Sequence, residues 1–382
     1  MRRMYWRPRK VSLRSIVILC VVALGGVAVS EAARRQRPSD PLAERKLAAA
    51  QLAEEAFAAI KQERLRRGHV IRPELDPAET GLIGEYLTPV TSTTGHLGSK
   101  QTSANPNFAA VVVEMLEQAG VREGDVVAVG CSGSFPALNV CVFCALETLG
   151  VEPIVVASAA ASQFGANMPD LLWIDMERHL RERGLVSFGS VAASYGGFED
   201  LAVGMTEEGR QLITEAIRRN QLPLIEEDDY ESSLEARMAL YEQHAAGRPV
   251  QAYINIGGGS VSVGRSTGKK LYQPGLNLET TEEALEIDSV LTRFARKGTP
   301  VIHLVEVQDI ARAYRLPNPP QEMIVAGEGE LFYNVPLGRQ VAGGALLVIV
   351  AMLAVSYRRG PGAPLKTARQ ASGADVVLRS GN

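Results

Sequence analysis

Aromatic residues are scarce in this chain of 382 residues, and several common signatures are missing. Phenylalanine, tryptophan and tyrosine together make up 5% of the sequence, which argues against a nucleic-acid surface that stacks bases on aromatic rings. The 36 glycines follow no collagen-like repeat, so fibrous structure is excluded. The segment Gly268-Lys269-Lys270 lacks the spacing and the Ser/Thr of a phosphate-binding loop, so a nucleotide site is not expected there.

Cysteine is also rare, with four residues in the whole chain. Cys20 lies in an apolar segment, and the other three are an odd number. Cys141 and Cys144 have the CxxC spacing, but they lie in an apolar run typical of a helix interior, whereas redox pairs usually begin a helix. Buried small residues are the favoured interpretation, with a redox pair as the alternative. The sequence has no second CxxC and no histidine pair that would complete a zinc site. We therefore predict no metal and no cofactor.

The net charge of −3 is unevenly distributed along the chain. Residues 1–14 carry six basic side chains, and residues 358–382 carry five basic side chains and one acidic one. Residues 15–357 therefore have a net charge of −13. Such an acidic body is a poor candidate for binding nucleic acid, and we expect no nucleic-acid partner.

Two apolar segments beside the basic tails predict transmembrane helices. Residues 15–30 contain 16 uncharged residues, and residues 340–357 contain 18. A cleaved signal peptide is the alternative for the first segment, and a buried core helix is the alternative for the second. Because basic residues favour the cytoplasmic side of membrane helices, both tails are expected in the cytoplasm. The sequence thus predicts a cell-membrane protein in contact with the lipid bilayer, with an extracytoplasmic main domain.

These features divide the chain into six expected parts. They are a cytoplasmic tail, a transmembrane helix or signal anchor, a helical stalk, an extracytoplasmic α/β domain, a second transmembrane helix and a second cytoplasmic tail. The parts span residues 1–14, 15–30, 31–84, 85–330, 340–357 and 358–382. The stalk includes a run of helix-forming residues from Pro41 to Gly68 that we interpret as a stalk or docking helix. A polar segment at residues 85–107 is expected to be a functional or disordered loop.

Strand and helix patterns alternate from residue 108 onward. This alternation predicts an α/β fold with a mostly parallel sheet and helices on both faces. The predicted strands cover residues 125–130, 153–158, 250–256 and 300–306. The predicted helices cover residues 108–119, 137–149, 170–183, 207–220, 230–246 and 281–296.

Two glycine-rich turns follow predicted strands, at the end of the sheet where α/β proteins usually bind ligands. The first turn, residues 130–134, resembles the G-x-S-x-G nucleophile elbow, except that Ser134 replaces the last glycine. Ser132 is therefore a candidate nucleophile, with passive ligand contact or simple turn chemistry as the alternatives. The candidate ligand-binding residues are Gly130, Gly133, Ser134, Asn139, Asn167, Gly258, Gly259 and Ser260.

A nucleophilic serine requires a base, and the sequence offers several candidates. Lys100 is one, because a desolvated lysine can accept a serine proton. Asp175 is another, four residues before His179 on a predicted helix, although such pairs are also common on surfaces. His303 lies in an apolar strand and is expected to be a buried core histidine. The remaining histidines are His69, His96 and His244. The acidic residues 226–229 are expected to be solvated, with a bound divalent cation as the alternative.

Several segments of the body carry a family resemblance. They include TPVTSTTGHLGSK (88–100), TSANP (102–106), GCSGSFPALN (130–139), GANMP (165–169), WIDME (173–177), YGG (195–197) and NIGGGS (255–260). As a set they resemble the poly-γ-glutamate system protein family, over most of residues 80–330 and the two flanking apolar segments. The resemblance implies a membrane protein that serves poly-γ-glutamate capsule biosynthesis or export beside other membrane components. It assigns no catalytic residue.

Two functions are open at this point. In the first, the protein is a membrane-anchored accessory component whose α/β domain binds a partner or an anionic chain end of poly-γ-glutamate. In the second, it is an exported serine-type amide hydrolase or transferase that acts on the polymer through Ser132. A body with a charge of −13 repels a polyanion over about 8 Å, the Debye length at physiological salt. A local anion pocket is therefore favoured over an open groove along the polymer.

Overall fold

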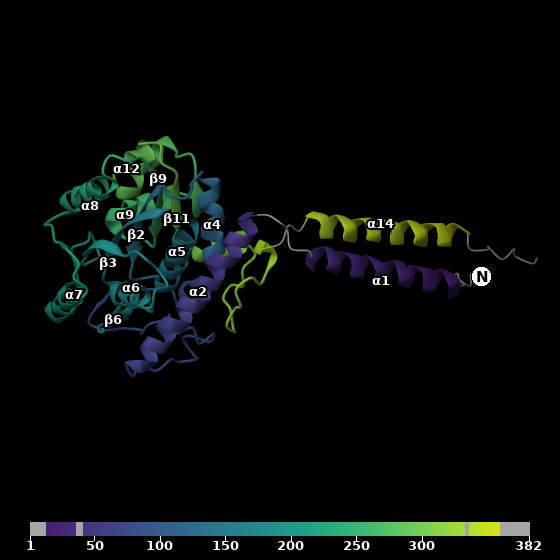
Figure 1. Cartoon of the computed structure of the whole chain (residues 1–382), viewed down its shortest axis with the longest axis horizontal. Helices are drawn as coiled ribbons and strands as arrows, with labels where there is room; N and C mark the ends of the chain where they lie inside the picture. The colour runs from purple at the N-terminus through teal and green to yellow at the C-terminus, as the bar shows by residue number, and fades with distance from the viewer. Residues whose placement is uncertain (1–12, 36–40, 333–335, 360–382) are drawn as a thin grey trace, which may run out of the picture. The chain divides into compact units, whose positions relative to one another are not determined.

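The computed structural model describes residues 13–35, 41–332 and 336–359, which belong to two separate units (Figure 1). One unit consists of the helices α1 (Leu13–Arg35) and α14 (Pro336–Arg359). The other is an α/β unit within residues 38–334. The two basic tails predicted at residues 1–14 and 358–382 lie almost wholly outside the described residues.

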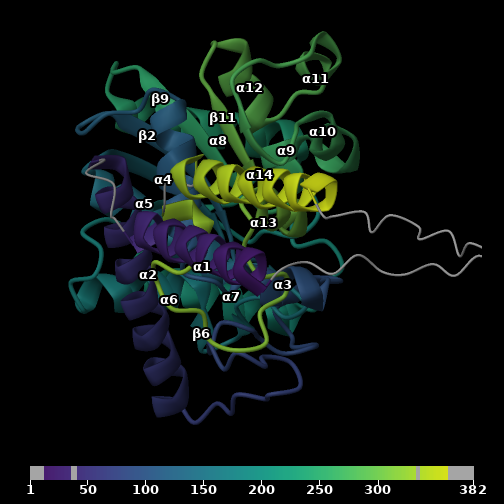
Figure 2. The same ribbon diagram turned by 90° about the vertical axis from the view of Figure 1, so that its right-hand side faces the viewer.

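The helices α1 and α14 lie side by side within their unit (Figure 2). They approach closely at Gly26, where an added Cβ would lie 2.7 Å from the Cβ of Ala345. Among the described helices, none combines the length and the apolarity that a membrane crossing requires. The prediction of two transmembrane helices is therefore wrong. The prediction of a membrane location with an extracytoplasmic main domain depends on those helices and is wrong as well.

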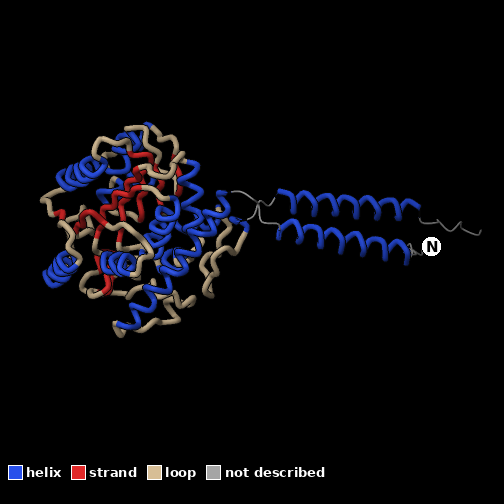
Figure 3. The backbone as a smooth tube through the Cα atoms, viewed as in Figure 1, coloured by secondary structure: helices blue, strands red, loops and turns tan. Residues whose placement is uncertain are grey.

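A seven-stranded sheet forms the centre of the α/β unit (Figure 3). All neighbouring strands are parallel except the edge strand β10, which runs antiparallel to β11. In spatial order the strands are β10 (Gly275–Asn277), β11 (Val301–Leu304), β9 (Val250–Ile256), β2 (Val126–Ser132), β3 (Glu152–Ser158), β7 (Ser190–Ser194) and β8 (Leu224–Ile225). The predicted α/β class with a mostly parallel sheet is thus confirmed.

Helices cover both faces of this sheet because the central strands are apolar on both sides. In β2, Val127 and Val129 face one hydrophobic cluster, and Val126 and Ala128 face the other. The first face is covered by α4 (Phe108–Gln118), α5 (Pro136–Leu149), α6 (Trp173–Glu182) and α13 (Val307–Ala313), and α7 (Glu207–Arg219) packs into the same cluster. The second face is covered by α8 (Tyr230–Ala245), α9 (Ser260–Val263), α11 (Glu282–Glu286) and α12 (Val290–Arg296).

The segment interpreted as a stalk or docking helix forms α2 (Pro41–Arg66), which packs against α4 and α5. The face of α2 that carries the small residues Ala49, Ala53 and Ala56 is fully buried. Phe57 and Ile60 of the same helix are buried too. The helix α2 therefore forms an outer layer of the α/β unit (Figure 1).

The polar segment 85–107 contains regular structure rather than a plain loop. It forms β1 (Thr91–Thr93), which pairs with β4 (Ala161–Ser162), and the short helix α3 (Leu97–Ser103). The remaining elements are β5 (Asn167–Met168), β6 (Leu171–Leu172), α10 (Arg265–Leu271) and the 3-10 helix η1 (Glu330–Phe332).

Cys141 and Cys144 lie in α5 and are completely buried, and burial raises the pKa of both thiols.

Candidate functional site at the switch point of the sheet

The chain changes direction across the sheet at β2. After β2 it runs outward through β3, β7 and β8, and it then returns through α8 to β9 on the other side of β2 and continues to β11. Open α/β sheets bind ligands at such a switch point, outside the carboxyl ends of the two strands that diverge from it. The two glycine-rich turns predicted from the sequence both lie there, because one follows β2 and the other follows β9.

The turn after β2 is tightly packed and leads directly into α5. The Ser134 backbone N–H donates to the Ser132 hydroxyl at 3.2 Å, and the Asn139 amide donates to the Ser132 carbonyl at 2.9 Å. An added Cβ at Gly133 would lie 2.8 Å from the Ala160 carbonyl oxygen, so only glycine fits without a shift of the backbone. The 14-residue helix α5 then begins at Pro136 and directs the positive end of its dipole toward the turn.

The turn after β9 approaches the first turn closely. Gly257 has φ +85°, and a Cβ there would lie 3.3 Å from the Ser132 Cβ and 3.4 Å from the Phe135 ring. Gly258 is exposed, and a Cβ on it would first meet the aliphatic stem of Lys269 at 3.6 Å. The predicted residues Gly133 and Ser134 therefore lie in the first turn, and Gly258, Gly259 and Ser260 lie in the second; we call the place where the two turns meet the switch-point crevice. Gly130 lies within β2, where an added Cβ would lie 2.5 Å from the Tyr253 hydroxyl.

Lys100 enters this region from α3, the helix formed within the polar segment. The His96 ring caps α3 by accepting the Ser99 N–H at 3.2 Å. The Lys100 side chain is buried, and its Nζ donates to the Ser134 carbonyl and to the Ser162 hydroxyl, the latter at 2.9 Å. The same nitrogen lies 3.6 Å from the centre of the Phe135 ring.

The Lys100 ammonium forms no ion pair with any residue that the structure describes. Burial and, to a smaller extent, the positive charge of Lys269 lower its pKa from 10.5 to about 7. Lys269 is partly exposed and lies 3.4 Å from a Glu306 carboxylate oxygen. The site therefore holds one buried lysine without a counter-charge and a second lysine at its exposed side.

Three predicted site residues have structural partners of their own. Asp175 is completely buried, accepts two hydrogen bonds from Arg219 at 2.8 and 2.5 Å, and accepts the Leu172 N–H that begins α6. Asn167 binds the backbone of Glu85 through both ends of its amide, at 2.8 Å each. Asn139 supports the first turn as described above. Neither Asp175 nor Asn167 has a recorded contact with Ser132.

The histidines offer no base to Ser132 in this structure. The His303 ring accepts from Asn255 at 3.1 Å, and its other nitrogen donates to the Lys269 carbonyl at 3.2 Å. Burial lowers the pKa of His303 to about 4, so it is a neutral core histidine, as the sequence predicts. In the acidic run, Glu226 accepts from the Tyr195 hydroxyl at 3.3 Å. Within the described part of the chain, no cluster of three metal-binding side chains is present.

Sequence reasoning missed two polar groups beside the crevice. The first is Ser162, the hydroxyl that Lys100 binds in place of Ser132. The second is a buried network in which Arg237 of α8 binds Asp200 at 2.7 Å and the hydroxyls of Ser158 and Ser194 at 3.0 and 2.7 Å. Ser158 and Ser194 end β3 and β7, and their register with Ser132 forms a row of hydroxyl residues along the carboxyl edge of the sheet. The strand β7 (SVAAS) contains a single β-branched residue, Val191, which is too weak a pattern to predict a strand there.

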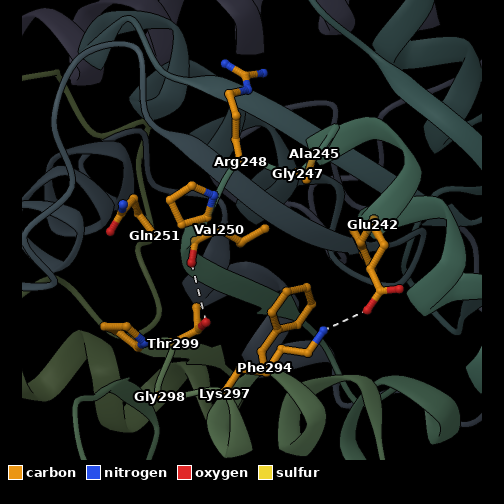
Figure 4. Close-up of a pocket in the computed structure, with 13 residues that line it drawn as sticks. Glu242, Ala245, Gly247, Arg248, Val250, Gln251, Phe294, Lys297, Gly298 and Thr299 are labelled. Atoms are coloured by element: carbon orange, nitrogen blue, oxygen red, sulfur yellow. Dashed lines mark hydrogen bonds and ion pairs between the residues drawn. The ribbon is translucent and has the colours of Figure 1, made fainter.

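A pocket of about 500 Å³ lies at the opposite edge of the sheet (Figure 4). It surrounds the first residues of β9 and the loop before β11, with Phe294 and Tyr241 among its lining residues. Glu242 and Lys297 form an ion pair of 2.7 Å across it. None of the predicted site residues lines this pocket, so it is not part of the switch-point crevice.

Comparisons with known proteins assign no family. No family model matches the chain, and no curated protein matches it. Among solved structures, an archaeal alanine:glyoxylate aminotransferase matches at 12% identity and a TM-score of 0.17, over 90% of this chain and 69% of that chain. A match at that level establishes neither a shared fold nor a shared function.

Proposed function

We propose that the switch-point crevice binds an anionic chain end of poly-γ-glutamate, and that the protein is an accessory component of the biosynthesis of that polymer. The observation that carries the proposal is the buried Lys100 ammonium, which forms no ion pair among the described residues. A buried charge without a partner is costly, and a bound carboxylate would offset that cost.

The surroundings of Lys100 suit a carboxylate better than a neutral ligand. The amino end of α5 adds a partial positive charge, and Lys269 adds a positive charge that it shares with the Glu306 carboxylate 3.4 Å away. The hydroxyl of the half-buried Ser134 is a further donor at the turn. These groups are typical of a site for a small anion.

The family resemblance supports the choice of polymer. The segments that carry it include residues 88–100, 130–139 and 255–260, which supply Lys100, the first turn and the second turn. Segments far apart in the sequence thus converge on one crevice. The acidic body opposes binding along the length of a polyanion, which favours recognition of a chain end.

Calorimetric titration of the full chain with a γ-linked glutamate pentamer tests the proposal. We expect Lys100→Met to weaken binding by at least about tenfold, or ~1.4 kcal/mol, because it removes the buried charge. Lys270→Met is the matched control, since Lys270 is an exposed lysine of α10 outside the crevice. Equal affinity of the wild-type and Lys100→Met proteins, or an equal loss in Lys270→Met, would overturn the proposal.

A further inference from the structure

The contact between Lys100 and Ser162 has a feature that anion binding does not require. The Lys100 Nζ lies 2.9 Å from the Ser162 Oγ, which is the distance of a direct hydrogen bond between a base and the hydroxyl it deprotonates. Both side chains are buried, at 3% and 5% exposure, so water competes little for either group. The structure shows no hydrogen bond between Ser132 and Lys100, and the Ser132 hydroxyl accepts the Ser134 N–H at 3.2 Å.

The position of Ser162 also suits a nucleophile. Its backbone N–H donates to the Ser134 hydroxyl at 3.0 Å, which connects Ser162 to the turn at the amino end of α5. An added Cβ at Gly165 would lie 2.8 Å from the Gly133 carbonyl, so the loop that follows Ser162 packs directly on the first turn. Ser134 and Phe135, the two half-buried residues in contact with Lys100, adjoin both the pair and the crevice.

We propose that Ser162 and Lys100 are a nucleophile and its general base, acting on a γ-glutamyl amide bond in those molecules whose Lys100 amine is neutral and therefore not paired with a ligand carboxylate. The choice of substrate rests on the proposed function, whereas the reactivity of the pair does not. The pKa of Lys100, lowered to about 7 by burial, leaves a substantial neutral fraction at neutral pH, which a base requires.

The proposed reaction proceeds in two balanced stages. The neutral Lys100 amine accepts the Ser162 hydroxyl proton as Oγ bonds to the amide carbon, and the carbonyl electron pair moves to oxygen. When that pair returns, the carbon–nitrogen bond breaks, and the Lys100 ammonium gives its proton to the leaving amine. Water or the amine of another chain then attacks the Ser162 ester, Lys100 accepts the proton of the attacking group, and the Ser162 oxygen takes that proton back as it leaves.

Labelling of the full chain with a fluorophosphonate probe, followed by peptide mass spectrometry, tests the pair without using the polymer. We expect a single label on Ser162, none in Ser162→Ala, and a rate that rises with pH through about 7. Ser187→Ala is the matched control. Ser187 is an exposed serine whose N–H and hydroxyl donate to Glu147, and no hydrogen bond joins it to Lys100 or Ser162.

Two lysine variants separate a base from a mere positive charge. We expect both Lys100→Met and Lys100→Arg to slow labelling at least tenfold, because arginine keeps the charge but does not deprotonate. Circular dichroism identifies any variant that fails to fold. The labelled residue in the wild-type protein shows, without these variants, whether Ser162 is the nucleophile. A label on Ser132, no label on the folded wild-type protein, or unchanged labelling in a folded Lys100→Arg protein would overturn the inference.

The test also separates this inference from the proposed function. If Ser162 is labelled but the γ-linked pentamer does not bind, the nucleophile pair stands and the substrate class is wrong. If the pentamer binds but Ser162 is not labelled, the crevice is a binding site alone.

Discussion

Several buried ionisable side chains form no ion pair among the described residues: Arg64 and Asp76 are hydrogen-bonded to backbone groups, and Lys100 and Glu177 are two others. Lys100 lies at the switch-point crevice, where a ligand is expected to supply the missing charge. Glu177 lies on α6, where its carboxylate accepts the Ser190 N–H at 2.5 Å and the Ser190 hydroxyl at 2.7 Å. Burial raises the pKa of Glu177 from 4.5 to about 7 despite these hydrogen bonds. We interpret Glu177 as structural, because its hydrogen bonds join α6 to β7.

The raised pKa of Glu177 predicts a pH dependence of stability with a definite sign. The folded state holds this proton up to about pH 7, whereas the unfolded chain loses it near pH 4.5. The stabilisation is therefore complete below pH 4.5 and is lost as the pH rises through 7. We expect Glu177→Gln, which cannot ionise, to gain about 2 kcal/mol relative to wild type between pH 5 and pH 8.

Urea denaturation of both proteins at the two pH values measures this difference. Glu182→Gln is a suitable control, because Glu182 is an exposed carboxylate near the end of the same helix. A stability difference between Glu177→Gln and wild type that stays constant with pH would show that Glu177 ionises normally in the folded protein.

At the scale of elements, the two turns differ in how much they tolerate a side chain. Gly257 has φ +85° and faces Ser132 and Phe135 at van der Waals distance, whereas Gly258 is exposed and a Cβ there meets no atom closer than 3.6 Å. We expect Gly257→Ala to destabilise the fold by about 1–3 kcal/mol, because alanine there is strained and crowded. Gly258→Ala is expected to change stability by less than about 0.5 kcal/mol. Equal thermal-melting shifts for the two variants would contradict the described packing of the turns.

The network of Arg237 gives a second prediction at this scale, because it joins α8 to the ends of β3 and β7. Arg237 and Asp200 are 1% and 8% exposed. We expect Arg237→Met alone to destabilise the fold by about 3–5 kcal/mol, since it leaves a buried carboxylate unpaired. Adding Asp200→Asn is expected to restore part of that loss. Chemical denaturation of the two single variants and the double variant measures the coupling, and strictly additive effects would mean that the pair does not interact.

The sequence predicted most elements because their patterns are strong. The pattern of residues 250–256 predicts a strand, which β9 confirms, and the glycine-rich turns follow the strands β2 and β9. The predicted helix at 281–296 is instead two helices, because the Ser289 hydroxyl caps a new helix by accepting the Thr292 N–H. Ser162 was not found, because its partner Lys100 lies 62 positions away and only the tertiary fold brings the two together. The apolar segments misled the prediction, because their composition resembles that of membrane helices, whereas no described helix is both long enough and apolar enough to cross a membrane.

At the scale of the whole molecule, charge determines how the protein meets a polyanion. The acidic body repels the polymer beyond the crevice, so only the end of a chain is expected to bind. We therefore expect the affinity per chain to be the same, within about twofold, for a γ-linked pentamer and for a polymer of several hundred residues. Calorimetric titration at matched concentrations of chain ends measures this. Affinity that grows in proportion to chain length would instead indicate binding along the polymer.

If a ligand carboxylate neutralises the buried Lys100 ammonium, the pKa of Lys100 rises when the ligand binds. Nuclear magnetic resonance of the lysine side chains, with the Lys100 signal assigned from Lys100→Arg, follows the titration with and without the γ-linked pentamer. We predict a pKa of about 7 in the free protein and a clearly higher value in the complex, because a nearby negative charge favours the protonated amine. An unchanged Lys100 pKa at saturating pentamer would show that no ligand carboxylate lies beside Lys100.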